Sequence, residues 1–403
     1  MNIDYPPEAD RLRAEVRAFL SRELPADFPG LGKLDDAEAR DFIAWWRTRL
    51  AASGYVAPSW PKEYGGAGLD KLGQVVLAEE FAKAEVPPNG LNDNFSIKMI
   101  GNLLLRFGTD EQKRRFLPRI VRGDDAWCQG FSEPGAGSDL ASLRTRARLV
   151  DGEWIIDGQK IWTSDARTAN WIFVLARTDP DAARHKGISM LLVPLDQPGI
   201  TIRPIRTMVG RSSFNETFFN EARTAEQNIV IGPNQGWKAA MALLGLERGD
   251  EVATNPILFG AEVDRLIALA KERGLAGDAL VRDQLVRAYT RAKIMRYLGL
   301  RTLTGWLKGE VPGRDASVSK LYWSEHHKTT TDLGVSLLGA QALAPTGRKP
   351  TRHYRADDPG APNSSASWVD SWMAAIAGTI YAGTSEIQRN ILAESALGLP
   401  KEP

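Results

Sequence analysis

The sequence lacks the residues that several classes of protein need. Its 403 residues include a single cysteine, Cys128, which excludes an intrachain disulfide and a zinc site built from several cysteines. Lys and Arg (51) nearly balance Asp and Glu (50), so the net charge of +1 provides no overall field to attract nucleic acid or an anionic membrane. The 43% hydrophobic and 25% charged residues are typical of a globular protein.

Long apolar runs are also missing. The longest nearly uncharged stretch near the end, residues 371–384, is shorter than the roughly 20 apolar residues that span a bilayer, and it predicts a buried helix. Residues 1–20 contain acidic residues and a double proline where a signal peptide has a basic start and an unbroken apolar run. We therefore expect a cytoplasmic protein.

Several chemical motifs are absent as well. Neither the G-x-G-x-x-G of dinucleotide-binding folds nor the G-x-x-x-x-G-K-[ST] of phosphate loops occurs. Residues 130–134 approach the nucleophile elbow G-x-S-x-G, but the fifth residue is proline. The four histidines form no H-E-x-x-H pattern. A Rossmann dehydrogenase and a hydrolase are disfavoured, and no metal site is expected.

Hydrophobic periodicity divides the chain into three parts. Residues 1–125 have apolar residues at helical spacing, and the same period returns over 231–403. Residues 126–230 contain short alternating runs, including a predicted β-hairpin around Asp151-Gly152. A polar insert at 345–367 predicts a mobile loop or a lid. We predict a mainly α fold with a central β domain.

Individual elements follow from the same periods. Strands are expected at 171–176 and 188–194, and another is expected to end near Phe219. The apolar stripes of the N-terminal part are Leu12, Val16, Phe19 and Leu20, and then Phe42, Trp45, Trp46 and Leu50.

Three segments contain residue types suited to binding a nucleotide cofactor. The glycine-rich run 131–139 can bring backbone N–H groups close to a pyrophosphate, although a tight turn would have the same composition. On a strand over 158–164, Trp162 and Ser164 would share one face and cover a flat ring, unless the tryptophan simply packs in a sheet core. Over 380–390 a Gly-Thr-Ser turn opens a helix, which favours a phosphate or serves only as a cap.

Taken together, these segments resemble the acyl-CoA dehydrogenase family of flavoproteins. The resemblance covers nearly the whole chain and rests on APSWPKEYGGAG, FSEPGAGSDL, GQKIWTS and YAGTSEIQRNILA. It implies an N-terminal helical domain, a middle β-barrel or sandwich and a C-terminal four-helix bundle that together hold FAD. The residues that it assigns to FAD are Phe131, Ser132, Gly137, Ser138, Trp162, Ser164, Thr384 and Glu386.

The catalytic base departs from the commonest family pattern. Removal of the α-proton of an acyl-CoA requires a base and a polarised thioester carbonyl. In many members the base is a glutamate directly before the Gly-Thr of the closing motif, but this chain has Ala382 there. Other members place it before an arginine on the helix after the β domain, which corresponds to Glu247 and Arg248. The β-hydrogen then leaves as hydride to flavin N5.

The residues around Glu247 support this assignment independently. Leu243 and Leu244 precede it by four and three residues on an apolar stripe, so Glu247 is predicted to face inward, where desolvation raises the pKa of a carboxylate. The alternative is a partly solvated glutamate paired with Arg248 or a lysine. The resemblance further implies that Ser138, Arg248 and the backbone N–H of Ala382 contact the substrate.

The resemblance also raises the question of the assembly. Family members reach the FAD of a neighbouring subunit with Arg-x-x-Phe-Gly and Gln-x-x-Gly-Gly, and the corresponding residues 272–285 and 336–340 differ here. Either a homo-oligomer (dimer or tetramer) or a heterotetramer with a homologous subunit is expected. The expected reaction is formation of a trans-2-enoyl-CoA, with an electron-transfer flavoprotein as acceptor. Alternatives are an acyl-CoA oxidase, a desulfinase-like member and a catalytically silent partner subunit.

Overall fold

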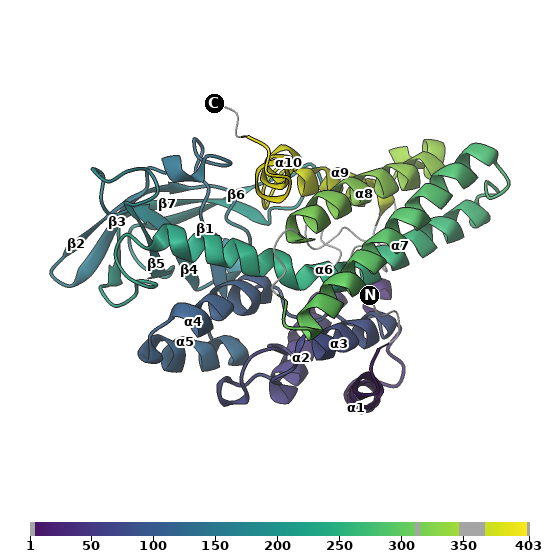
Figure 1. Cartoon of the computed structure of the whole chain (residues 1–403), viewed down its shortest axis with the longest axis horizontal. Helices are drawn as coiled ribbons and strands as arrows, with labels where there is room; N and C mark the ends of the chain where they lie inside the picture. Colours follow the sequence, from purple (N-terminus) through teal and green to yellow (C-terminus); the bar gives the residue numbers. More distant parts are fainter. Residues whose placement is uncertain (1–4, 311–314, 346–366, 401–403) are drawn as a thin grey trace. The chain divides into compact units, whose positions relative to one another are not determined.

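The computed structural model describes residues 5–310, 315–345 and 367–400, and at 36, 245–251, 315 and 316 it describes the backbone alone. The polar insert predicted at 345–367 therefore lies almost entirely outside the described residues. Figure 1 shows the helices and strands of the chain, which divides into two compact units. The first unit comprises Met1–Arg49, Leu69–Pro88 and Arg248–Pro403, and the second comprises Leu50–Gly68 and Asn89–Glu247.

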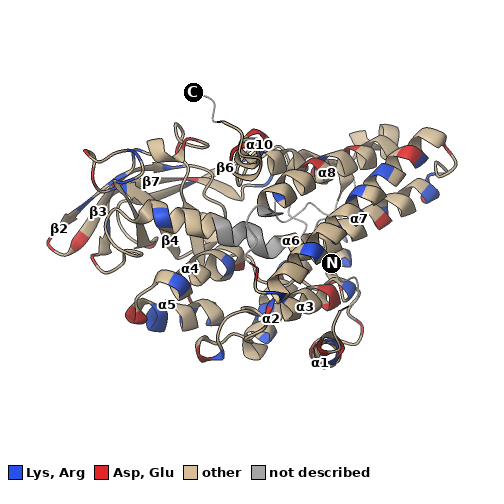
Figure 2. Cartoon of the chain, in the orientation of Figure 1, with Lys and Arg blue, Asp and Glu red and all other residues tan. Residues whose placement is uncertain are grey.

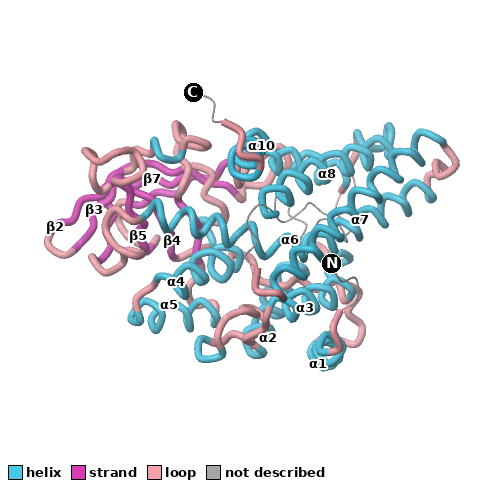
Figure 3. Tube along the Cα trace, in the orientation of Figure 1, coloured by secondary structure: helices cyan, strands magenta, loops and turns pink. Residues whose placement is uncertain are grey.

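The second unit is organised around one seven-stranded sheet, drawn in magenta in Figure 3. Its strands run in the order β1-β4-β2-β3-β7-β6, and β5 pairs with β4. Strands β1 and β4 are parallel, whereas β2–β3, β3–β7, β4–β5 and β6–β7 are antiparallel. The strand bounds are β1 Trp127–Gly130, β2 Arg146–Val150, β3 Glu153–Lys160, β4 Trp171–Arg177, β5 Ile188–Pro194, β6 Ile200–Ile205 and β7 Phe214–Ala225.

The predicted hairpin is confirmed at its turn. Asp151 and Gly152 join β2 to β3 with φ angles of 50° and 81°, the two left-handed residues that a tight type I′ turn needs. The expected strands at 171–176 and 188–194 correspond to β4 and β5, whose central residues are fully buried in the core of the sheet. These runs lack alternation because both of their faces are covered.

One strand prediction is wrong. Strand β3 ends at Lys160, so Trp162 and Ser164 do not lie two residues apart on a strand. Trp162 has a φ of 60°, a left-handed backbone that does not continue a regular strand. The chain turns away after Ile161, whose N–H donates to the carbonyl oxygen of Ser132.

Helices complete the second unit. In η3 the backbone is a π-helix, and α5 begins with a capping box formed by Thr109 and Gln112. The amide of Gln112 also donates to the carbonyl oxygens of Gln227 and Ile229, which fixes α5 against the segment after β7. The bounds are η3 Asn94–Gly101, α4 Asn102–Phe107, α5 Asp110–Arg122 and the first part of α6 (Gly236–Glu272).

The first unit is helical. Its N-terminal helices bury most of the predicted stripes. Val16, Phe19 and Leu20 on α1, and Trp46 and Leu50 on α2, are buried, whereas Leu12, Phe42 and Trp45 are partly buried. The bounds are α1 Glu8–Glu23, α2 Asp36–Ser53, α3 Lys71–Lys83, the remainder of α6, α7 Ala279–Leu307, α8 Asp315–Leu338, α9 Trp368–Ala375 and α10 Ser385–Ile391.

The C-terminal helices pack around α8, which contacts α7, α9 and α10. Their core includes Leu266 of α6, Leu285 of α7, Leu333 and Leu337 of α8 and Trp368 of α9. The single helix predicted over 371–384 is wrong beyond Ala375, where a 3-10 turn over Ile376–Thr379 follows. The turn contains Gly378, and glycine weakens a helix interior.

The distribution of charged residues and the hydropathy of the helices agree with the near-zero net charge and the lack of long apolar runs in the sequence. Figure 2 shows basic and acidic residues interspersed along α1, α5 and α7. Among the described residues, no helix combines the length and the apolar character that crossing a membrane requires. The single cysteine, Cys128, is buried in β1.

Candidate functional site

The glycine-rich loop begins directly after β1 and is held to β3 by a buried ion pair. The ammonium of Lys160, the last residue of β3, donates to the Phe131 carbonyl oxygen at 3.0 Å and to Glu133 Oε1 at 2.8 Å. Lys160 is fully buried and Glu133 is 8% exposed. The Ser132 carbonyl oxygen accepts from the N–H of Ile161 at 2.9 Å. Residues 131–133 are therefore fixed beside the segment that leads to Trp162.

Glu133 also closes the far end of this loop. Its two carboxylate oxygens accept from the backbone N–H groups of Arg144 and Thr145 at 2.7 and 2.8 Å. Burial alone would raise the pKa of Glu133, but the attraction of Lys160 and these hydrogen bonds outweigh it and lower the pKa below 4.5. Burial lowers the pKa of Lys160 to about 8, partly opposed by Glu133. The ion pair thus opposes the effect of burial on both groups.

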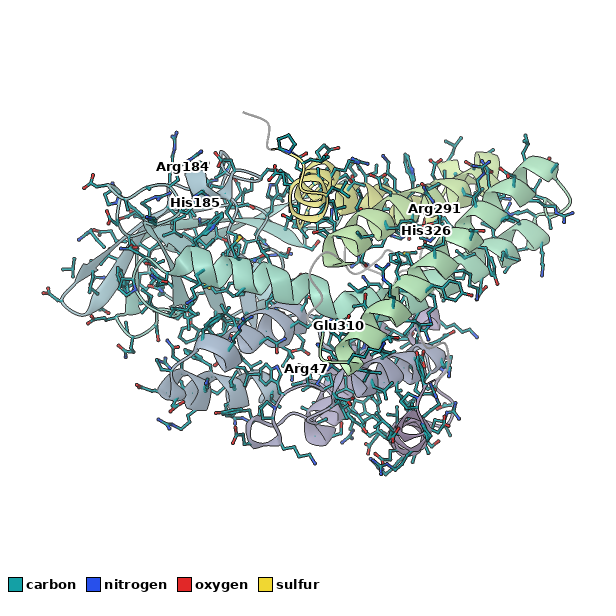
Figure 4. The ribbon with its side chains drawn as sticks, viewed as in Figure 1. Arg47, Arg184, His185, Arg291, Glu310 and His326 are labelled. Carbon is teal, nitrogen blue, oxygen red and sulfur yellow. The ribbon has the colours of Figure 1, made fainter. Side chains whose placement is uncertain are left out.

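The middle of the loop is open. In the described part of the chain, no atom lies within 4 Å of the position that a Cβ atom would take at Gly135 or Gly137, and Ser138 is exposed. The neighbouring Asp139 forms an ion pair with Arg184, at 2.5 Å, from the β4–β5 loop. Figure 4 shows Arg184 and His185 next to one another. These residues leave room for a ligand above the glycines.

Trp162 presents its indole to the surface. It is 55% exposed, which is unusual for a tryptophan, and its left-handed backbone is uncommon for a bulky residue. The ring of Phe214 supports it edge-on, with centroids 5.8 Å apart. Thr163 is buried, and its N–H donates to the Asn215 carbonyl oxygen. Ser164 is partly exposed. The segment thus holds an aromatic plane with hydroxyl and peptide groups at its side.

The closing motif belongs to the first unit. Ala382 and Gly383 are both left-handed, with φ angles of 52° and 91°. Gln388 is fully buried, and its amide donates to the Ala382 carbonyl oxygen at 3.1 Å. Thr384 is the N-cap of α10 and accepts from the N–H of Ile387, so the Gly-Thr-Ser turn opens a helix as predicted. The bond from Gln388 offsets part of the cost of the left-handed turn.

Glu386 lies in the first turn of α10 and is exposed. Hydrogen bonds from its own backbone N–H and from the Thr384 hydroxyl hold its pKa below the usual value. Ser385 is buried, and its hydroxyl donates to Glu325 of α8. The start of α10 is therefore fixed to α8.

The proposed base lies on α6, which is helical without a break from Gly236 to Glu272. Position 247 falls one turn after Leu243, which is fully buried, so the two positions share a helix face. The side chains of Glu247 and Arg248 lie outside the described residues, and their predicted orientation stays a prediction. Glu247 ends the second unit and Arg248 begins the first unit again.

The predicted site residues therefore form two groups. Those of the second unit are Phe131, Ser132, Gly137, Ser138, Trp162, Ser164 and Glu247. The contacts of residues 131–133 with 160–161 join the start of the glycine-rich loop to the segment that leads to Trp162. Those of the first unit are Arg248, Ala382, Thr384 and Glu386. An exposed aromatic plane beside an open glycine loop with free hydroxyl groups fits a flavin ring and its phosphates.

Sequence reasoning missed three residues that hold these segments: Glu133, Lys160 and Gln388. Lys160 falls at an inward position of β3, so a charged residue at a core position of a strand was the available signal. Glu133 and Gln388 carried no comparable signal in the sequence, because their partners become known only in the folded chain.

Comparison with known families extends the resemblance along the chain. Residues 6–124 match the acyl-CoA dehydrogenase N-terminal domain, residues 128–222 match the middle domain, and residues 234–397 match the C-terminal domain. The chain is similar to acyl-CoA dehydrogenase IpdE1 of Mycobacterium tuberculosis, with 42% identity over 98% of this chain and 99% of that protein.

Comparison with solved structures agrees with the family match. The chain is similar to the steroid ACAD Tcur3481-Tcur3483, with a TM-score of 0.81 and 32% identity over the full length of both chains. It is also similar to the ChsE4-ChsE5 complex of Mycobacterium tuberculosis, with a TM-score of 0.77 and 29% identity over the full length of both chains. Both names denote assemblies of two different chains.

Proposed function

Because the chain belongs to the acyl-CoA dehydrogenase family of flavoprotein oxidoreductases, which act on the CH–CH group of acyl-CoA thioesters, we propose that it forms a trans-2-enoyl-CoA with FAD as its cofactor. The observation that carries the proposal is the match of all three domains together with the exposed Trp162 plane beside the open glycine loop. FAD, held by the residues assigned to it below, would supply the acceptor for the hydride that leaves the β-carbon. The chain's own residues supply binding, orientation and proton removal.

Glu247 is the proposed base for the α-proton. A glutamate directly before an arginine on α6 takes over this role because Ala382 has no carboxylate. The base accepts the α-proton on a carboxylate oxygen while the electrons of the C–H bond move towards the thioester carbonyl. The backbone N–H of Ala382 is the proposed donor to the thioester oxygen, since a backbone donor needs no particular side chain. The left-handed turn held by Gln388 supports this role.

The cofactor contacts follow the two groups of residues. We assign the flavin and its phosphates to Phe131, Ser132, Gly137 and Ser138, the isoalloxazine plane to Trp162 and Ser164, and the adenosine diphosphate part to Thr384 and Glu386. The open space at Gly137 and the exposed Trp162 indole support the first two assignments.

The CoA moiety is anionic, so cationic side chains favour its binding. Arg248 and Ser138 are the proposed contacts from the motifs, and the β4–β5 loop adds Arg184, His185 and Lys186, all exposed. The ion pair of Arg184 with Asp139 fixes this loop beside Ser138. His185 contacts Trp237 edge to face, with ring centroids 4.6 Å apart, which offers a stacking surface for an adenine.

The assembly and the acyl group follow from the relatives. The two-chain steroid ACAD and the ChsE4-ChsE5 complex support a heteromeric assembly with a homologous subunit and a bulky, steroid-derived acyl group. The altered residues 272–285 and 336–340 agree with a site that a different subunit completes. A homo-oligomer is the alternative, and an electron-transfer flavoprotein is the proposed acceptor.

An anaerobic visible spectrum tests the function. Holoprotein mixed with pooled straight, branched and ring-bearing acyl-CoAs is expected to bleach, and Glu247→Gln is expected to keep its flavin spectrum without bleaching. Glu251→Gln, one turn further along α6, is the matched control and should bleach as the parent does. Bleaching of Glu247→Gln at the parent rate overturns the assignment of the base. One FAD per subunit after expression alone overturns the heteromeric proposal.

A further inference from the structure

The segment from Trp162 to Asp165 contains two left-handed residues that are not glycine. Trp162 has a φ of 60° and Asp165 has a φ of 53°. Such a backbone is energetically costly and persists only where its surroundings fix it, and it is found most often at functional sites. The proposed function assigns the flavin ring to Trp162 and Ser164. The contacts that fix this segment therefore set how both side chains are presented.

The segment begins with a β-bulge. Lys160 pairs with Thr217, and a backbone hydrogen bond of 2.9 Å joins the N–H of Thr163 to the carbonyl oxygen of Asn215. Residues 161–162 thus stand opposite a single residue of β7, which is the arrangement of a β-bulge. Bulges redirect side chains next to active sites. The direction of the indole therefore depends on how this bulge is closed.

Asn215 closes the bulge with its side chain as well as its backbone. Its carboxamide NH₂ donates to the Thr163 carbonyl oxygen at 2.9 Å, so the N–H and the carbonyl group of Thr163 both bond to one residue 52 positions away. Asn215 is 1% exposed, and its carboxamide oxygen has no hydrogen-bond partner among the described residues. The side chain therefore acts as a donor.

Other residues of β7 and the segment before it support the same turn. The Thr217 hydroxyl donates to the hydroxyl of Thr163 at 3.2 Å. The Ser213 carbonyl oxygen accepts from the N–H of Asp165 at 2.8 Å. The amide of Asn215 holds the Thr163 carbonyl, which belongs to the peptide group that leads into Ser164.

We propose that Asn215 is a positioning residue for FAD, because it fixes the two peptide groups of Thr163 that lie between the Trp162 indole and the Ser164 hydroxyl. Asn215 is itself buried, so its effect on the flavin passes through these two neighbours. Without the amide donor the costly backbone can relax, and a bulky residue such as tryptophan then leaves the left-handed region. This inference rests on the proposed function.

Two alanine variants of buried asparagines test the proposal. Asn215→Ala is expected to weaken FAD binding to the deflavinated protein by about tenfold, as loss of the indole itself would. Asn228→Ala is the matched control, because Asn228 is 4% exposed and its amide bonds Thr224 and Arg115. It is expected to lower the Tm measured without FAD and to leave the affinity for FAD unchanged. An affinity that falls with Tm in both variants, or in neither, overturns the proposal.

A double-mutant cycle shows whether Asn215 acts through Trp162. In the Trp162→Ala background, Asn215→Ala is expected to weaken FAD binding by about threefold or less, because the indole is absent and Ser164 alone remains to be misplaced. A loss of the same size in both backgrounds overturns the proposal.

Asn215→Asp tests the donor while the shape of the side chain is retained. A carboxylate cannot donate to the Thr163 carbonyl oxygen, whereas a protonated carboxyl group can, and burial raises the pKa of a carboxyl group. Relative to the parent at the same pH, the affinity for FAD is expected to be about tenfold lower at about pH 8 and to recover at about pH 5. This variant keeps the proposal testable if Asn215→Ala does not fold. A deficit of equal size at both pH values overturns it.

The outcomes also separate this inference from the proposed function. A parent protein that binds FAD and bleaches with an acyl-CoA, together with an Asn215→Ala variant of unchanged affinity, supports the function and overturns the role of Asn215. A parent protein that binds no FAD, even with a partner subunit present, overturns the function and the inference together.

Discussion

The ammonium of Lys160 lies 2.8 Å from Oε1 of Glu133, and both side chains are buried. The two residues are 27 positions apart, and their contact joins the end of β3 to the start of the glycine-rich loop. A buried pair of this kind is costly to break, because removal of one partner leaves an uncompensated charge in the interior.

Lys160→Met is therefore expected to destabilise the protein by about 3–5 kcal/mol and to weaken flavin retention. Urea unfolding measures the first effect, and the flavin-to-protein absorbance ratio after gel filtration measures the second. Lys186→Met, which removes an exposed lysine of the β4–β5 loop, is the control for loss of one charge. Adding Glu133→Gln to Lys160→Met should recover part of the stability, and an additive loss would contradict the pairing.

His326 of α8 is expected to make the stability of the protein depend on pH. The side chain is fully buried near Arg291 (Figure 4), and neither ring nitrogen has a hydrogen-bond partner among the described residues. Burial lowers the pKa of His326 from 6.5 to about 4, with Glu262 opposing and His327 and Arg291 adding to the effect. As pH falls from 6.5 towards 4, the unfolded chain binds a proton that the folded chain does not. Protonation of His326 therefore does not reduce the free energy of unfolding above pH 6.5, and it reduces this free energy increasingly as the pH falls below 6.5.

His326→Leu is expected to stabilise the protein by about 1–3 kcal/mol at neutral pH. The gain should increase on acidification by up to about 1.4 kcal/mol per pH unit between pH 6.5 and 4. Chemical denaturation of both proteins at several pH values measures this difference. A gain that does not depend on pH would show that His326 does not titrate in this way, and His185→Leu serves as the exposed control.

Replacement of Trp162 is expected to weaken FAD binding without destabilising the protein. Its indole is 55% exposed, so Trp162→Ala removes little buried surface and should leave the free energy of unfolding nearly unchanged. Loss of the aromatic plane should lower the affinity for FAD by about tenfold, since an aromatic contact contributes about 0.5–1.5 kcal/mol beyond its buried area. Fluorescence titration of the deflavinated protein measures the affinity. Trp162→Phe should bind nearly as the parent does, and equal affinities for all three proteins would refute the assignment.

We predict that a glutamate at position 382 can replace Glu247 as the catalytic base. In many family members a glutamate occupies this position, so Ala382→Glu combined with Glu247→Gln should restore part of the flavin reduction that Glu247→Gln loses. Stopped-flow absorbance under anaerobic conditions measures the rate. Ala377→Glu in the same background is a control for an added carboxylate on the preceding turn. Recovery with both variants, or with neither, would count against a base that acts from these two positions.

Much of the architecture could be predicted from local pattern. Local patterns of apolar residues and turn residues predicted the order of helical and β segments, most of the buried stripes of α1 and α2, the strands β4 and β5 and the helix that the Gly-Thr-Ser turn opens. The left-handed turn at Asp151-Gly152 also follows from the residues themselves. Such features depend on neighbours within a few positions, and the sequence contains those directly.

Only the tertiary structure decided the rest. Whether Lys160 meets Glu133, whether His326 is buried without a partner and whether Asn215 bonds Thr163 depend on residues brought together from distant segments. The end of β3 before Trp162 is likewise set by the bond from Ile161 to Ser132, across 29 positions. The sequence by itself determined the family and the candidate base, because motif residues stand in fixed order. Burial and hydrogen-bond satisfaction required the fold, because they are properties of the space around a side chain.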